Sequence, residues 1–134
     1  MYLKIFKICI ALLLMNGCFA PSSLKVYFDK VTNTISTCSN EVIRELYIYE
    51  KPRYAAKYSS SFRLIKLDNE VSGSSKIIVD KSNFGYSGNE GFSFTPNYTY
   101  KIEIPHLDSY TEIFIHTDEL GNISSVENEF DCNG

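Results

Sequence analysis

The chain has 134 residues, a formal net charge of −3 and four cysteines, and 14% of its residues are aromatic. Its acidic balance disfavours a role in binding nucleic acid, which needs a basic face. The length allows one domain with a real core and is too short for two.

Residues 1–17 have the pattern of a signal peptide. Lys4 and Lys7 precede an apolar run at residues 8–15, which Asn16 interrupts. A membrane-spanning helix needs about 20 apolar residues, so this run is too short to cross a bilayer. We expect residues 1–17 to be removed on export. The alternatives are an uncleaved N-terminal anchor and a buried helix.

Residues 14–18, Leu-Met-Asn-Gly-Cys, resemble the lipobox of bacterial lipoproteins, in which an aliphatic residue and two small residues precede the modified cysteine. The resemblance implies that Cys18 is lipidated and that residues 18–23 are a short tether. No aspartate follows Cys18, so the best-known signal for inner-membrane retention is missing. We therefore favour the outer membrane, with the protein facing the periplasm of a bacterial cell envelope.

A competing cleavage site follows Ala20 and would give a plain secreted protein. Pro21 would then follow the cut bond, and proline fits an extended protease cleft poorly because it lacks an N–H and its φ angle is fixed. We therefore favour cleavage before Cys18.

The remaining cysteines predict a disulfide. Cys9 leaves with the signal peptide and Cys18 takes the lipid, which leaves Cys38 and Cys132 in an oxidising compartment. We expect these two to be bonded. The alternative is two separate thiols.

Residues 24–134 predict an all-β domain. Apolar and polar residues alternate over short runs rich in tyrosine, phenylalanine, valine and isoleucine. The candidate strands are residues 24–31, 34–37, 42–49, 62–67, 76–79, 98–104, 112–116 and 123–130. Turn-forming residues separate them, and residues 118–122 have the composition of a hairpin loop. About seven or eight such strands predict an antiparallel β-sandwich.

Residues 94–104 narrow the prediction to a particular kind of β-sandwich. The segment Phe-Thr-Pro-Asn-Tyr-Thr-Tyr-Lys-Ile-Glu-Ile resembles the penultimate strand of fibronectin type III and related immunoglobulin-like domains, where a tyrosine fixes the corner at which the strand begins. Tyr98 and Tyr100 are both candidates for that tyrosine.

Catalytic motifs and phosphate-binding loops are missing from the sequence. His106 and His116 each lie two residues before an aspartate, but a metal site needs three or four converging ligands. We expect a non-catalytic protein without metal or cofactor.

Two segments have the residue types of recognition surfaces. Residues 47–58 combine tyrosines with cations, and residues 83–92 combine aromatic residues with glycines. The alternatives are a strand followed by a surface crossover, and a loop whose rings fold onto the core. The candidate partner-binding residues are Tyr47, Tyr49, Arg53, Tyr54, Tyr58, Phe84 and Tyr86.

The lipobox, the single small β-domain, Cys38 and the element formed by Phe94, Pro96 and Tyr100 together resemble periplasmic type VI secretion immunity lipoproteins. This resemblance implies a protein that binds and neutralises a cognate secreted toxin. Two alternatives share the fold: a periplasmic accessory or carbohydrate-binding module, and a structural lipoprotein that supports an envelope complex.

Overall fold

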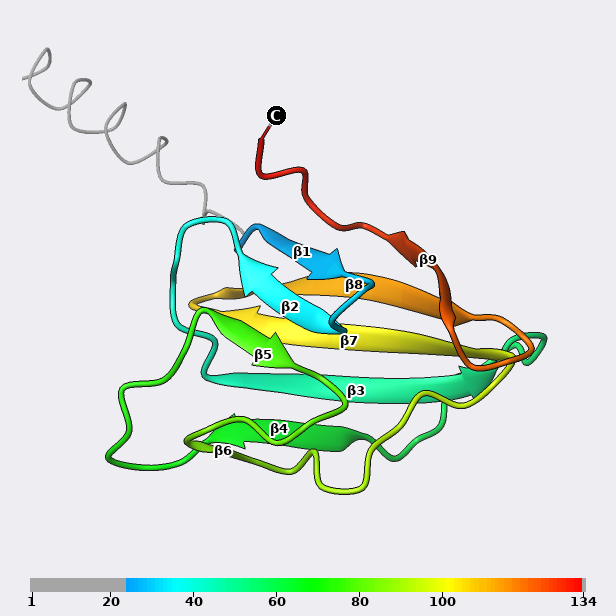
Figure 1. Ribbon diagram of the computed structural model, residues 1–134, viewed down its shortest axis with the longest axis horizontal. Helices are drawn as coiled ribbons and strands as arrows, with labels where there is room; N and C mark the ends of the chain where they lie inside the picture. The colour runs from blue at the N-terminus through cyan, green and yellow to red at the C-terminus, as the bar shows by residue number, and fades with distance from the viewer. Residues whose placement is uncertain (1–23, 134) are drawn as a thin grey trace, which may run out of the picture.

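The computed structural model describes residues 24–133, which form nine β-strands and no helix (Figure 1). No helix that could span a membrane occurs among these residues. The strands are β1 (Val26–Asp29), β2 (Thr34–Thr37), β3 (Glu45–Pro52), β4 (Arg63–Leu67), β5 (Lys76–Ile78), β6 (Tyr86–Ser87), β7 (Tyr98–His106), β8 (Ser109–Thr117) and β9 (Ile123–Glu127).

The strands form two antiparallel sheets that pack as a sandwich, which confirms the predicted fold class. The smaller sheet has the order β1-β2-β5, and the larger has the order β6-β4-β3-β7-β8-β9 (Figure 1). Without β6 and β9, the remaining seven strands have the order of a fibronectin type III domain. The short β6 and the terminal β9 extend the larger sheet at its two edges.

The core lies between the two sheets and follows the period-2 pattern of the strands. On β7, Tyr100, Ile102 and Ile104 are fully buried, whereas Lys101 and Glu103 between them are partly exposed on the other face. The smaller sheet contributes Val26, Phe28, Ile35 and Ile77, and the larger sheet contributes Leu46, Ile48, Ile65, Ile113 and Ile115.

Each of the eight expected runs contains a strand, although some boundaries differ. β8 begins at Ser109 because a tight turn through Leu107, whose φ is 50°, lets pairing with β7 start immediately. β3 begins at Glu45, and the earlier Ile43 instead forms an isolated bridge with Ser74. β6 was not expected, because two residues are too few to show an alternating pattern.

Tyr100 is the corner tyrosine of the fold. Its side chain is fully buried, and its hydroxyl oxygen accepts a 2.7 Å hydrogen bond from the backbone N–H of Thr95. The rings of Phe92 and Phe94 pack edge-on against it. Tyr98 lies one pleat earlier and is only partly buried.

The predicted disulfide between Cys38 and Cys132 is confirmed, with the two Cα atoms 5.3 Å apart. It fixes the last described residues, 128–133, which we call the C-terminal strap. The strap leaves the edge of the larger sheet after β9 and reaches the smaller sheet, where the Phe130 N–H donates to the Val26 carbonyl at 2.7 Å. The chain thus closes one side of the sandwich.

Candidate functional site

The outer face of the larger sheet carries a cluster of aromatic and basic side chains. On β3, Tyr47 and Tyr49 alternate with the buried Leu46 and Ile48, so both tyrosines point away from the core. Other members come from β7 and from the connection between β3 and β4. We call this cluster the aromatic face; it consists of Tyr47, Tyr49, Lys51, Tyr58, Phe62 and Lys101.

Phe62 lies at the centre of the aromatic contacts. Its ring centroid is 5.1 Å from that of Tyr47 and 5.6 Å from that of Tyr49. The side chain nevertheless stays 50% exposed. A half-exposed ring held in place by two neighbours provides apolar contact area at a small cost in side-chain entropy.

Two lysines cover the tyrosines on this face. Lys101 Nζ lies 4.5 Å from the ring centroid of Tyr49 and 5.5 Å from that of Tyr58, and Lys51 Nζ lies 4.9 Å from the Tyr58 ring. These distances are in the range of cation–π attraction. Lys101 also forms a 2.9 Å ion pair with Glu103.

The surroundings of Lys101 and Tyr58 determine whether these two side chains are charged. The hydrogen bond and charge of Glu103 raise the pKa of Lys101, while burial raises the pKa of Tyr58. Lys101 therefore stays positively charged and Tyr58 stays neutral at physiological pH. The aromatic face thus presents cations and neutral phenol groups side by side.

Arg53 and Tyr54 lie beside the aromatic face, in the loop after β3. The backbone N–H of Arg53 donates to the Asn97 carbonyl at 2.8 Å, which anchors the loop to the start of β7. Tyr54 is 92% exposed. Of the seven predicted partner-binding residues, five therefore lie on or next to one surface.

A slot of about 530 Å³ opens next to Phe62. It is bounded by β3, the start of β4 and residues 91–95 of the loop before β7. Arg63 is held in the slot by 2.9 Å and 3.2 Å hydrogen bonds to the carbonyls of Gly88 and Glu90, and its guanidinium lies over the Phe92 ring. Ile48, Glu50, Ser61, Ser93 and Thr95 complete the lining.

The other two predicted residues lie elsewhere. Phe84 is 92% exposed and precedes β6, near the start of β3, so it is at the opposite end of the larger sheet from Tyr54. Tyr86 is buried, and its hydroxyl donates to the Ile43 carbonyl at 2.5 Å while accepting from the Ser74 N–H at 2.9 Å. Tyr86 thus joins the two sheets and is not available to a partner.

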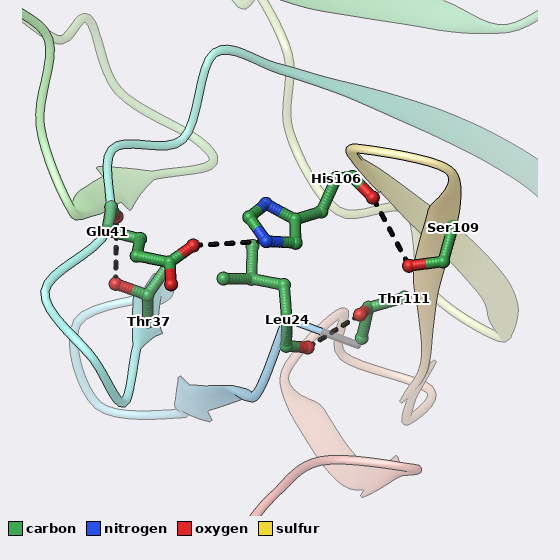
Figure 2. A network of polar contacts seen from close by, with 6 residues as sticks. All are labelled: Leu24, Thr37, Glu41, His106, Ser109 and Thr111. Atoms are coloured by element: carbon green, nitrogen blue, oxygen red, sulfur yellow. Dashed lines mark hydrogen bonds and ion pairs between the residues drawn. The ribbon is translucent and has the colours of Figure 1, made fainter. Parts of the chain in front are cut away.

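Figure 2 shows a polar network at the end of the sandwich where residue 24 enters. His106 Nε2 lies 3.2 Å from Glu41 Oε2, and the Thr37 hydroxyl donates to the Glu41 carbonyl at 2.9 Å. The Thr111 hydroxyl donates to the Leu24 carbonyl at 2.6 Å. These contacts connect both sheets, so we assign the network a structural role.

His116, at the opposite end of the β7–β8 pair, also contacts one carboxylate. Its Nε2 lies 3.3 Å from Glu127 Oε1, and its Nδ1 lies 3.0 Å from the Thr99 hydroxyl oxygen. Each histidine therefore meets a single carboxylate. Residues 24–133 contain no group of three or more histidine, cysteine, aspartate or glutamate side chains arranged to hold a metal ion.

The sequence did not single out Phe62, Lys101 or the slot. Phe62 and Lys101 each occur in an ordinary strand pattern, and only the pairing of β3 with β7 brings Lys101 opposite Tyr49. The predicted signal peptide, the lipidation site Cys18 and the tether residues 18–23 lie outside the described residues.

Comparisons with protein families, with curated proteins and with solved structures find no match to this chain. Its class is therefore defined by its own fold and surface. Residues 24–133 form an antiparallel β-sandwich whose strands, apart from β6 and β9, have the order of a fibronectin type III domain, with the Cys38–Cys132 disulfide at one side.

Proposed function

We propose that this protein is a lipid-anchored, non-catalytic protein of the bacterial periplasm, and that it binds and neutralises a cognate secreted toxin. The observation that carries the binding role is the aromatic face, where Tyr47, Tyr49, Tyr58 and Phe62 gather with two lysines on one accessible surface. The lipobox resemblance at residues 14–18 supports the anchor. The resemblance to immunity lipoproteins supports the toxin as partner.

The composition of the aromatic face suits a protein partner. Tyrosine and phenylalanine are enriched at the centre of protein interfaces, where they provide large contact areas and can also form hydrogen bonds. Lys51 adds a positive charge at the face, whereas Lys101 is paired with Glu103. Tyr47 meets Glu45, so the face carries both signs and would favour a partner whose charges complement that pattern. An inhibitor of this kind needs shape and charge complementarity and no reactive group.

The position of Leu24, the first described residue, also supports this proposal. Leu24 lies next to the end of β7 and the start of β8, whereas Arg53 and Tyr54 follow the far end of β3 (Figure 1). A chain anchored through Cys18 would therefore hold the loop of residues 53–61 away from the membrane. A soluble partner could reach this loop and the aromatic face.

A carbohydrate-binding module is the second candidate, and the slot beside Phe62 favours it. Glu50, Arg63 and three hydroxyl side chains line the slot, and such groups pair well with sugar hydroxyls. On the aromatic face itself, however, Phe62 meets Tyr47 at an interplanar angle of 68°, and Lys101 covers Tyr49. These rings are therefore tilted against one another or covered on one side, and they do not form one continuous flat platform for a sugar.

The test is capture of the cognate toxin by the purified chain, followed by measurement of Kd for defined variants. We expect Phe62→Ala to weaken binding at least about tenfold, as for a central interface residue. Phe84→Ala is the matched control, because it removes an exposed phenylalanine at the other end of the sheet and should leave Kd unchanged.

Protection of cells provides the functional readout. Deletion of the gene should make cells sensitive to neighbouring kin that deliver the toxin, and the Phe62→Ala variant should restore less protection than Phe84→Ala. The immunity proposal fails if deleted cells remain unharmed and no toxin is captured. Glycan binding by the purified chain that Glu50→Gln abolishes would support the second candidate.

A further inference from the structure

The C-terminal strap covers the free edge of β1 through specific contacts. The Phe130 N–H donates to the Val26 carbonyl at 2.7 Å, and the Phe28 N–H donates to Glu129 Oε2 at 3.1 Å. Lys25 Nζ lies 4.9 Å from the Phe130 ring centroid. The strap is only six residues long, and its covalent attachment is the bond from Cys132 to Cys38.

The covered backbone groups are those that another strand would use. The Cys38 N–H donates to the Lys25 carbonyl at 2.9 Å, so the N–H and carbonyl groups of Lys25 point toward β2. Because backbone direction alternates along a strand, Val26 and Phe28 direct their N–H and carbonyl groups to the other side. A free edge with such groups is a template for pairing with another chain.

We propose that the β1 edge is a strand-pairing surface for a second copy of this chain, and that the C-terminal strap keeps the protein monomeric by covering it. Antiparallel pairing about a two-fold axis at Tyr27 would place Val26 opposite Phe28 of the other copy. These two residues would then exchange both of their backbone hydrogen bonds.

The charges on β1 and on Lys25, directly before it, favour the second copy over an unrelated strand. Val26 and Phe28 point into the core, so Lys25, Tyr27 and Asp29 occupy the outer face of the smaller sheet. In the same register, Lys25 of one copy would lie opposite Asp29 of the other, on both sides of the two-fold axis. Opposite charges placed across a strand pair stabilise it, whereas like charges destabilise it.

The disulfide keeps the C-terminal strap on the β1 edge. Cys38 follows β2 directly and is hydrogen-bonded to Lys25, so the bond to Cys132 holds the strap against the edge that it covers. Contacts made by Glu129 and Phe130 alone would be in competition with an incoming strand. The oxidised protein therefore stays monomeric in this proposal.

The test measures the mass of the full chain in solution with Cys18→Ser as background, which removes the predicted lipid site. We expect the oxidised parent to be a monomer by light scattering. Two variants release the strap in different ways: Cys38→Ser with Cys132→Ser removes the covalent bond, and Glu129→Gln with Phe130→Ala weakens the contacts while keeping the disulfide. Each should double the measured mass.

Charge reversal identifies the interface. In either strap variant, Lys25→Asp should return the protein to a monomer, and Lys25→Asp combined with Asp29→Lys should restore the dimer. The Phe28 amide should be protected from hydrogen exchange in the dimer and exchange rapidly in the charge-reversed monomer. The proposal is overturned if the folded strap variants stay monomeric, or if they dimerise regardless of the charge at position 25.

Discussion

The hydroxyl oxygen of Tyr100 accepts a hydrogen bond from the backbone N–H of Thr95 at 2.7 Å, across the corner where the chain enters β7. The tyrosine side chain is fully buried, and burial raises its pKa, so the hydroxyl remains protonated. This contact fixes the loop before β7 to the strand that it precedes. The same loop forms one wall of the slot beside Phe62.

Replacing Tyr100 by phenylalanine tests this corner. Tyr100→Phe keeps the ring in the core but leaves the Thr95 N–H without its acceptor, so we expect the free energy of unfolding to fall by about 1 kcal/mol. Urea denaturation measures the change. Tyr98→Phe is the matched control one pleat away, and a similar loss in both variants would contradict the assignment of Tyr100 as the corner tyrosine.

The Cys38–Cys132 disulfide spans 94 residues of sequence, so it strongly restricts the unfolded chain. Replacing both cysteines by serine should lower the free energy of unfolding by about 4.7 kcal/mol, the value that the chain-entropy relation gives for a loop of this length. Denaturation of the oxidised parent and the double variant provides the comparison. A loss below about 1 kcal/mol would mean that the disulfide contributes little to stability.

Gly88 has a φ of 107°, and a Cβ at this position would collide with the carbonyl oxygen of Leu64 on β4. We expect Gly88→Ala to lower the free energy of unfolding by about 2 kcal/mol or more, because it adds both backbone strain and a steric clash. Gly91→Ala separates the two causes. Gly91 also has a positive φ of 69° but has open space around it, so its loss should be about 1 kcal/mol.

Asp118 organises the hairpin loop between β8 and β9. Its Oδ1 accepts 2.9 Å hydrogen bonds from the backbone N–H groups of Asn122 and Leu120, and these bonds lower the pKa of the carboxyl group below its ordinary value of 3.8. The ionised form therefore stabilises the fold. This contribution is complete above pH 3.8 and is lost as the pH falls through the lower folded-state pKa.

The Asp118→Asn variant tests whether the ionised Asp118 carboxylate stabilises the fold. The parent should be more stable than the variant near neutral pH, and the difference should shrink as the pH falls below about 4. Denaturation across this pH range measures the effect, and the NMR titration of Asp118 should give a pKa below 3.8. Asp108→Asn, in the turn between β7 and β8, is the control. An equal difference at all pH values would contradict the prediction.

Much of the fold follows from local sequence patterns. The alternation of apolar and polar residues identified a run for every strand except β6, since period 2 is visible over four or more residues and not over two. The same alternation places Tyr47 and Tyr49 on one face. Counting the cysteines predicted the Cys38–Cys132 pair, because the predicted signal peptide and the predicted lipidation of Cys18 assigned the other two, and the structure confirms the bond.

The candidate site depends on contacts that no local pattern encodes. Tyr49 meets Lys101 because β3 pairs with β7, and these residues are far apart in sequence. Tyr86 lies in a segment whose composition is typical of an exposed loop. Its hydroxyl nevertheless forms hydrogen bonds with the backbone of Ile43 and Ser74 inside the sandwich.

The positions of strands and turns follow from short stretches of sequence, because the direction of each side chain and the conformation of each turn depend on neighbouring residues. Which strands become neighbours depends on how two whole sheets bury their apolar faces together. That packing selected Tyr100 over Tyr98 for the corner, assembled the aromatic face around Phe62, and brought the C-terminal strap to the edge of β1.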